Sequence, residues 1–233
     1  PSALQIQYEV GATEIPVVVP DYSVIPPTYG VSALDDVPRG FTVNVAQISD
    51  VQADSSSAHG QNLEKAEQQL AGTLLSVEGK PFYNEASDSK NGWVPASTVV
   101  EGIINWSEDA PTDAGYFGQL ATNQTDVEIP LIPGSGNSTN GLVIEVLAYL
   151  ELEAGYHHLG INTLGGYQAS MGPDGRDRLA PVIGSYEDAV RYSFLGDKYF
   201  DVLAPEAGFY PIRILFTHSE RTEEGASMEF FSL

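Results

Sequence analysis

LELEAGYHHLGINTLGGYQASMGPDGRD, residues 150–177, is the stretch that decides the fold of this chain. Polar and apolar residues alternate on both sides of Ala154-Gly155, which is typical of strands with one buried and one solvated face. Ala154-Gly155 predicts a hairpin turn, and residues 163–166 interrupt the pattern before residues 167–171 resume it. Residues 172–175, GPDG, then form a turn signal. This order predicts meandering antiparallel strands of a β-sandwich, whose end loops commonly bind ligands.

Charge is the unusual feature of the composition. The chain has 233 residues with 32 Asp+Glu against 10 Lys+Arg, and its net charge is −22 at pH 7. A field of this sign repels phosphate, which argues against nucleic acid and anionic membranes as partners. Two interpretations of the acidity stay open: solubility in a salty medium, and collection of cations by specific carboxylates.

The chain contains no cysteine. Disulfides, thiolate catalysis and cysteine-type metal sites are therefore excluded. No apolar run approaches the roughly 18 residues of a membrane span, and residues 1–10 lack the basic and apolar regions of a signal peptide. If the protein is exported, we expect this sequence to be its mature form or an excised domain.

Strands are predicted along most of the chain by alternation and by short apolar runs between turn residues. Besides the opening stretch, they cover residues 4–10, 15–20, 41–48, 99–106, 126–133, 142–152, 180–186, 192–202, 210–216 and 226–232. The one predicted helix is residues 62–75, where apolar residues from Leu63 to Leu74 share a face and Asn62 opens the helix. One helix among many strands predicts an all-β antiparallel sandwich of the jelly-roll type, with the helix as a plug or brace across the sandwich.

Residues 1–38 differ in composition from the rest and are rich in Pro, Val and Ile. We expect them to form an extended N-terminal arm outside a single domain of residues 39–233. Residues 15–20, IPVVVP, carry proline at both ends, which suits an edge strand. Two interpretations remain: the arm lies on the domain's own sheet, or it completes the sheet of a neighbouring copy of the protein.

Seven segments in order carry a family likeness: FTVNVAQI (41–48), AEQQLAG (66–72), VEGIINWSEDAPTDAGYF (100–117), AYLELEAGYHHLGINTLGGY (148–167), MGPDGRD (171–177), EAGFYPIRILF (206–216) and ASMEFFS (226–232). In their order and spacing they resemble the protective-antigen-type (PA-14) β-sandwich domain of large secreted bacterial proteins. The resemblance covers residues 39–233.

The resemblance implies an extracellular, cell-surface or secreted module that binds carbohydrate or serves in adhesion. In calcium-dependent members of this family, an Asp-Asp pair in one loop holds Ca²⁺, which then coordinates sugar hydroxyls. Leu164 and Gly165 stand at the matching positions here, and neither offers the side-chain oxygen that Ca²⁺ requires. Gly166 and Tyr167 keep the turn and the inward aromatic of that loop.

Residues 106–117 combine aromatic and acidic side chains in one predicted loop. Aromatic faces stack on sugar rings while carboxylates accept hydrogen bonds from hydroxyls, although the same side chains could simply cover the end of the sandwich. The predicted glycan-binding set, which includes the aromatic of the family's loop, is Trp106, Glu108, Asp109, Asp113, Tyr116 and Tyr167.

Asp174 and Asp177 are the candidate metal ligands, in the sequence PDGRD. With the backbone of residues 172–175 they could form an oxygen-rich Ca²⁺ site, although the spacing is too short for an EF-hand loop. The alternative is a turn whose aspartates bond neighbouring backbone amides.

No catalytic constellation stands out, so we expect no enzyme. His157 and His158 are adjacent, and on a strand they point to opposite faces, so they cannot chelate one metal. The hypothesis is a non-catalytic module that binds polysaccharide or cell-surface glycan. The alternative is a structural subunit of an extracellular surface assembly or filament, joined to copies of itself through its N-terminal strand.

Overall fold

The computed structural model describes residues 22–33, 39–48, 52, 62–86, 92–112, 115–121, 124–133, 141–186, 198–218 and 226–233. The strands are β1 Ser23–Val24, β2 Phe41–Gln47, β3 Ala96–Val100, β4 Ile104–Ser107, β5 Val127–Glu128, β6 Leu142–Leu152, β7 Gly155–Leu164, β8 Gly166–Met171, β9 Val182–Tyr186, β10 Lys198–Ala204, β11 Gly208–His218 and β12 Ser227–Ser232. The helical segments are η1 Pro27–Tyr29, α1 Leu63–Leu70 and η2 Tyr116–Ala121.

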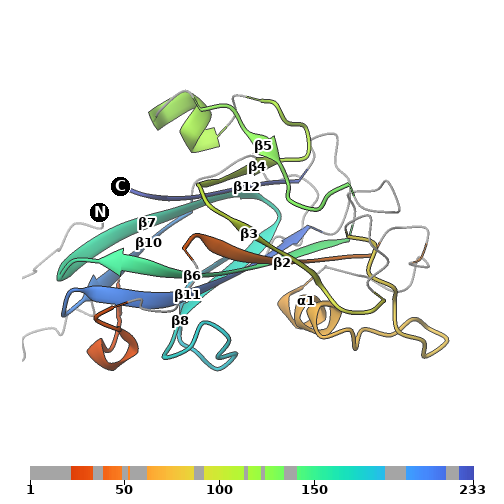
Figure 1. Cartoon of the computed structure of the whole chain (residues 1–233), viewed down its shortest axis with the longest axis horizontal. Helices are drawn as coiled ribbons and strands as arrows, with labels where there is room; N and C mark the ends of the chain where they lie inside the picture. Colours follow the sequence, from red (N-terminus) through yellow and green to blue (C-terminus); the bar gives the residue numbers. More distant parts are fainter. Residues whose placement is uncertain are drawn as a thin grey trace, which may run out of the picture.

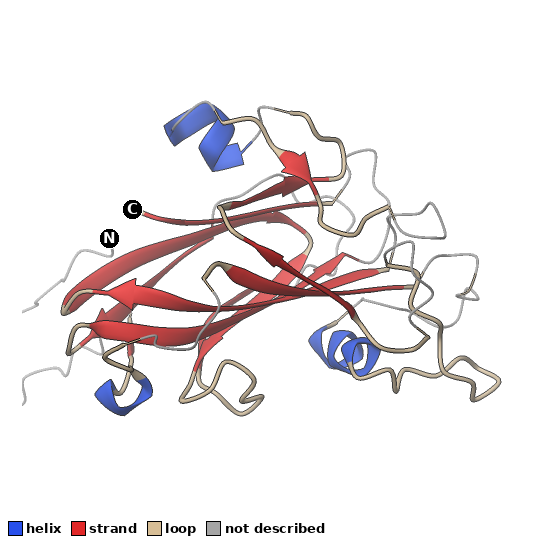
Figure 2. Cartoon of the chain, viewed as in Figure 1, coloured by secondary structure: helices blue, strands red, loops and turns tan. Residues whose placement is uncertain are grey.

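Two six-stranded sheets face each other across one core (Figures 1 and 2). Sheet A has the order β1-β10-β7-β12-β4-β5, and sheet B has the order β3-β2-β6-β11-β8-β9. Most neighbouring strands pair antiparallel, and the helical segments lie outside the two layers, as Figure 2 shows. The predicted all-β antiparallel sandwich is therefore confirmed.

The core lies between the inner faces of the two sheets, because alternate residues of each strand point inward. Sheet B contributes, among others, Val43, Ile144, Val146, Ile212, Ile214 and Phe216. Sheet A contributes, among others, Ile104, Trp106, Leu159, Ile161, Val202 and Met228. Burial of apolar side chains of this size from both layers supplies the main driving force for folding.

The chain from Leu150 onward passes from one sheet to the other and back again, and this corrects the predicted meander. β6 pairs with β2 and β11 in sheet B, whereas β7 pairs with β10 and β12 in sheet A. The turn at Ala154-Gly155 therefore joins the two sheets and is no hairpin. Gly165 returns the chain to sheet B with φ 136°, and a Cβ there would lie 2.2 Å from the carbonyl oxygen of Thr217. Only glycine fits this second crossing.

The prediction of one continuous strand over residues 99–106 is wrong. β3 belongs to sheet B and β4 to sheet A, with a break at residues 101–103. Apolar residues stand on both sides of the break, at Val99-Val100 and Ile103-Ile104, so the sequence reads as one strand and conceals it. The strand predicted at residues 126–133 is likewise reduced to β5, Val127–Glu128.

Helix α1 is shorter than predicted and packs on the outer face of sheet B. Asn62 caps it, with its side-chain oxygen accepting a hydrogen bond from the backbone N–H of Lys65 at 2.9 Å. Ala66 packs against Val143 and Leu215 of the sheet. Leu74 lies beyond the helix in a separate small cluster.

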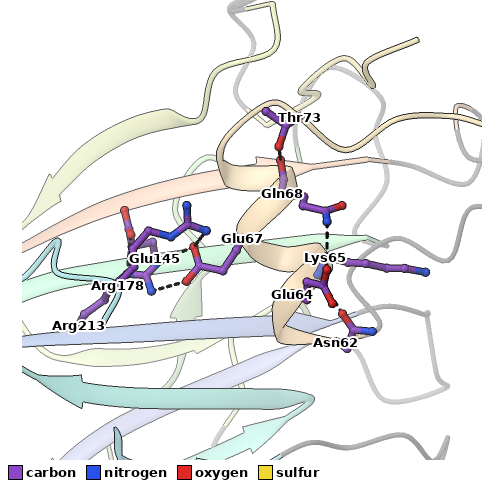
Figure 3. Close-up of polar contacts among 9 residues, drawn as sticks. All are labelled: Asn62, Glu64, Lys65, Glu67, Gln68, Thr73, Glu145, Arg178 and Arg213. Atoms are coloured by element: carbon purple, nitrogen blue, oxygen red, sulfur yellow. Dashed lines mark hydrogen bonds and ion pairs between the residues drawn. The ribbon is translucent and has the colours of Figure 1, made fainter. Parts of the chain in front are cut away.

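Ion pairs fasten this helix to the sheet (Figure 3). Arg213 donates to Glu67 of α1 at 2.5 Å and 3.0 Å and to Glu145 of β6 at 2.7 Å. Arg178 reaches Glu67 at 2.8 Å from the outside. In the described part of the chain, charge and apolar contact thus hold the helix to sheet B alone, so it does not lie across the sandwich as predicted.

Residues 22–33 of the predicted arm lie on the sandwich. β1 pairs parallel with β10, and Ile25 is buried in the core. Val31 bridges to Phe209 of β11. The remaining arm residues, 1–21 and 34–38, lie outside the described part of the chain. No helix in the described ranges is long and apolar enough to span a bilayer.

Candidate functional site

The outer face of sheet A gathers polar and aromatic side chains from four strands. Because Leu159, Ile161, Val202 and Met228 point into the core, their neighbours along the same strands point outward. The outward residues are Asn105 of β4; His158, Gly160 and Asn162 of β7; Tyr199 and Asp201 of β10; and Glu229 and Phe231 of β12. Figure 1 shows η2, the yellow-green turn at the top, on this outer side.

Aromatic rings form a continuous row across this face, which we call the aromatic row: Tyr116, Phe117, Phe231, Tyr199 and His158. The rings of Tyr116 and Phe231 stack with centroids 3.8 Å apart and planes 5° from parallel. Phe117 meets both rings edge-on. This apolar contact attaches η2 to the sheet.

The row ends in a more exposed group. Tyr199 contacts Phe231 edge-on at 6.0 Å and stacks on His158 at 5.0 Å with planes 12° apart. Nδ1 of His158 lies 2.5 Å from Oδ1 of Asp201, the residue opposite it in the β7–β10 ladder. Tyr199 is 44% exposed, and the side chains of His158 and Asp201 are 37% and 40% exposed. An aromatic ring and a polar pair thus face solvent together.

Glu229 anchors η2 from below. Its carboxylate accepts hydrogen bonds from the backbone N–H groups of Tyr116 at 2.8 Å and Phe117 at 3.0 Å. It also accepts one from the side-chain amide of Asn162 at 2.7 Å. Gly115 approaches with φ 72°, and a Cβ there would lie 2.1 Å from Oε2 of Glu229. A side chain at residue 115 would break this anchor.

Burial makes Glu229 an unusual acid. The residue is 4% exposed, and this desolvation raises the pKa of its carboxyl above the ordinary value. Its three N–H donors lower the pKa, and the nearby charge of Asp126 raises it. With its nitrogen turned toward both acids, the amide of Asn105 lies 3.2 Å from Oε1 of Glu229 and 2.9 Å from Oδ1 of Asp126. Thr112 donates a further bond to Asp126.

Two predicted ligand-binding aromatics are buried, which corrects their assignment. Trp106 is 1% exposed and Tyr167 is 2% exposed, and both pack in the core. Each occupies an inward position of its strand, so its ring faces are covered by other side chains. Burial raises the pKa of Tyr167 to about 12. The inward orientation expected for Tyr167 is confirmed, but neither ring can stack on a ligand from solvent.

The other predicted glycan-binding residues are spread out. Tyr116 belongs to the aromatic row. Glu108 accepts a bond from the backbone N–H of Ala226 at 3.1 Å, while Asp109 is exposed at the turn after β4. Asp113 lies outside the described residues. Of the predicted glycan-binding residues that the structure describes, only Tyr116 belongs to the aromatic row, together with its neighbour Phe117, which was not in the predicted set.

Asp174 and Asp177 bond their own turn. Oδ1 of Asp174 accepts from the backbone N–H of Arg176 at 2.8 Å, and Oδ1 of Asp177 accepts from that of Leu179 at 2.9 Å. This is the geometry of the turn interpretation. In the part of the chain that the structure describes, no three His, Asp or Glu residues cluster as metal ligands. Ca²⁺ binding stays a prediction.

Sequence reasoning missed most of the aromatic row. Alternation identifies Tyr199, Asp201, Glu229 and Phe231 as a face opposite to apolar neighbours, and this signal was available. What it lacks is the order of strands, which places β10, β7 and β12 side by side. The sequence alone therefore does not show that these residues share one face.

Comparison of this chain with solved protein structures supports the fold. No family model matches the sequence, and no curated protein matches it. Among solved structures, the A domain of epithelial adhesin 9 from Candida glabrata, in complex with Galβ1-4GlcNAc, is similar with a TM-score of 0.50 and 14% identity, over 87% of this chain and 84% of that one.

Two other solved structures have lower scores. The A domain of epithelial adhesin 6 from Candida glabrata, in complex with Galβ1-3GlcNAc, has a TM-score of 0.49 and 16% identity over 88% of this chain and 84% of that one. A PA14 sugar-binding domain from an RTX adhesin has a TM-score of 0.37 and 9% identity over 84% and 89%. The adhesin A domains have the PA-14 fold, so the predicted resemblance is confirmed as one of fold.

Proposed function

We propose that this domain is a non-catalytic module that binds glycan outside the cell or at a cell surface. The observation that carries the proposal is the exposed end of the aromatic row, where Tyr199 lies beside the His158–Asp201 pair. The fold is compatible with this role, because an adhesin A domain of the same fold has been solved with a bound disaccharide.

The chemistry of this group suits a sugar. A pyranose ring presents C–H groups on its faces and hydroxyls at its edge, so it needs an aromatic surface with hydrogen-bonding groups beside it. Tyr199 supplies ring surface and a hydroxyl. Among the described residues nothing bonds Nε2 of His158 or Oδ2 of Asp201, so both can reach ligand hydroxyls.

Charge narrows the class of glycan. With a net charge of −22, the domain repels sulfated, sialylated and uronate-rich chains. Neutral glycans meet no such barrier. We therefore expect neutral polysaccharide or neutral cell-surface glycan to bind more strongly than acidic chains.

The test is a glycan array probed with the wild-type chain and with Tyr199→Ala, each with Ca²⁺ and with a chelator. Leu179→Ala is the matched control, because Leu179 is 93% exposed and lies away from the aromatic row. We expect wild-type binding to neutral glycans that Tyr199→Ala loses and Leu179→Ala retains. Loss of wild-type binding in chelator would add a Ca²⁺ requirement. If the wild-type chain bound no glycan on the array, the proposal would be overturned.

A further inference from the structure

The chain has two tryptophans, and they lie in opposite environments. Trp106 is 1% exposed in the core, whereas Trp93 is 56% exposed in the turn before β3. Tryptophan is highly buried on average, since its indole is the largest side chain and prefers apolar contact. An indole left more than half in water is therefore a feature to explain.

The backbone on both sides of Trp93 is held by one buried residue. Asn84 is 5% exposed, and its backbone N–H donates to the carbonyl of Gly92 at 2.8 Å. Its side-chain nitrogen donates to the carbonyl of Val94 at 2.9 Å, while its oxygen accepts from the backbone N–H of Gln47 at 2.8 Å. The turn is thereby fastened to the end of β2, so the backbone that carries Trp93 is held in place.

A second contact supports the turn from the helix side. Gly72 follows α1 with φ 65°, and a Cβ there would lie 2.5 Å from the carbonyl oxygen of Trp93. The backbones touch at this point, and glycine permits it. Val94, the next residue along the chain, is 61% exposed. Trp93 and Val94, which we call the Trp93 platform, thus form a small apolar surface on a pre-organised support.

The size of this surface selects its occupant. One aromatic side chain buries about 150–250 Å². A stable protein interface needs about 800 Å² from each partner. A sugar ring is of the smaller size, and a rigid indole loses little conformational entropy when it binds one. The net charge of −22 again favours an uncharged ring.

We propose that Trp93 is a second carbohydrate contact of this domain, taking the face of a neutral hexopyranose unit; this rests on the proposed glycan-binding function. Trp93 leads into β3, the edge strand of sheet B, whereas the aromatic row lies on the outer face of sheet A. The two contacts therefore belong to different layers. Their joint use would raise the avidity for long or densely packed glycans without any new contact.

The experiment uses the intact chain and its own fluorescence. Acrylamide quenching is measured with and without chitohexaose, cellohexaose, soluble mannan and Galβ1-4GlcNAc. Since Trp106 is buried, quenching reports on Trp93. We expect a bound saccharide to protect Trp93, and Trp93→Ala to weaken binding of the polymeric sugars by about tenfold, with Trp93→Phe retaining most of the affinity.

Leu179→Ala is the control for removal of an exposed apolar side chain, and it should bind as wild type does. The blue emission of Trp106 and an unchanged thermal midpoint establish that Trp93→Ala is folded. The role of Trp93 would be overturned if saccharide left the acrylamide quenching of the wild-type chain unchanged and Trp93→Ala bound as tightly as wild type. If Tyr199→Ala were still impaired, the proposed function would stand. No binding of any saccharide by wild type, here or on the array, would overturn both.

Discussion

Gly160 lies directly beneath the ring of Phe231, where a Cβ would come within 2.3 Å of the ring carbon Cε2. The two residues are on neighbouring strands, β7 and β12, and both face outward. Because the ring lies flat on the sheet, its other face is free to stack on Tyr116. The absence of a side chain at residue 160 therefore lets Phe231, and with it the aromatic row, pack close to the sheet.

Gly160→Ala should therefore destabilise the fold and disturb the row. The added methyl group has to displace Phe231 and with it Tyr116, and overpacking of this kind costs about 1–3 kcal/mol. The measurement is urea unfolding followed by circular dichroism. Gly102→Ala is the control, since nothing lies within 4 Å of a Cβ at that position. Equal stability of the two variants would contradict the close contact.

Glu229→Gln should change how stability depends on pH. Burial raises the folded-state pKa of Glu229 above its ordinary value of 4.5, so the folded state holds the proton more tightly than the unfolded state does. The corresponding stability is present below about pH 4.5 and is lost as pH rises through the folded-state pKa. Glutamine does not titrate, so the variant should lack this decline.

The measurement for Glu229→Gln is the free energy of unfolding of both proteins between pH 4 and pH 8. We expect the variant to be at its greatest disadvantage at the acidic end and to improve relative to wild type as pH rises. Parallel curves across the range would mean that the carboxyl titrates alike in the folded and unfolded chains.

Arg213→Ala should loosen the helix from sheet B. Arg213 is 5% exposed and bonds both Glu67 and Glu145, so its removal leaves two carboxylates facing each other. Breaking a buried pair of this kind costs about 3–5 kcal/mol. Arg178 offers a matched control, because it also pairs with Glu67 but its side chain is 56% exposed. Arg178→Ala should cost about 1 kcal/mol or less. Similar losses for both variants would count against the buried pair.

Local patterns predicted elements well and their partners poorly. The strand expected over residues 142–152 is β6, Leu142–Leu152, because its alternation is long and its ends are marked by turn residues. The helix was found from one apolar face, yet it stops at Leu70, since Leu74 packs elsewhere. His158 and Asp201 are 43 residues apart in sequence, and only the ladder between β7 and β10 brings them together.

The tryptophans show the same limit for the site. Trp106 ends the strand predicted over residues 99–106, whereas Trp93 lies outside every predicted element, and neither position alone shows whether the ring faces the core or water. Trp106 occupies an inward position of β4, while Trp93 lies in a turn held by Asn84. Burial depends on the second sheet, which is built from residues far away in sequence. The choice between the two rings therefore needed the assembled sandwich.

Asp201→Ala should weaken glycan binding without unfolding the domain. The His158–Asp201 pair is partly exposed, so its contribution to stability should be about 1 kcal/mol or less. A hydrogen bond that a charged carboxylate accepts from a ligand hydroxyl is worth about 1.5–3 kcal/mol, which corresponds to a loss of roughly 10-fold to 150-fold in affinity. The measurements are titration calorimetry with a glycan identified on the array and a thermal melt of each variant.

Glu78→Ala is the matched control for Asp201→Ala. Glu78 also belongs to an exposed ion pair, with Lys80 at 2.7 Å, but it lies in the loop after α1 and far along the chain from the aromatic row. Its loss should leave both affinity and melting temperature unchanged. If Asp201→Ala binds as tightly as Glu78→Ala does, the glycan does not use the exposed end of the aromatic row, and the contact must be sought at Trp93 or in the loops around Asp109. A variant that loses affinity and melts as wild type does would separate recognition from folding at this pair.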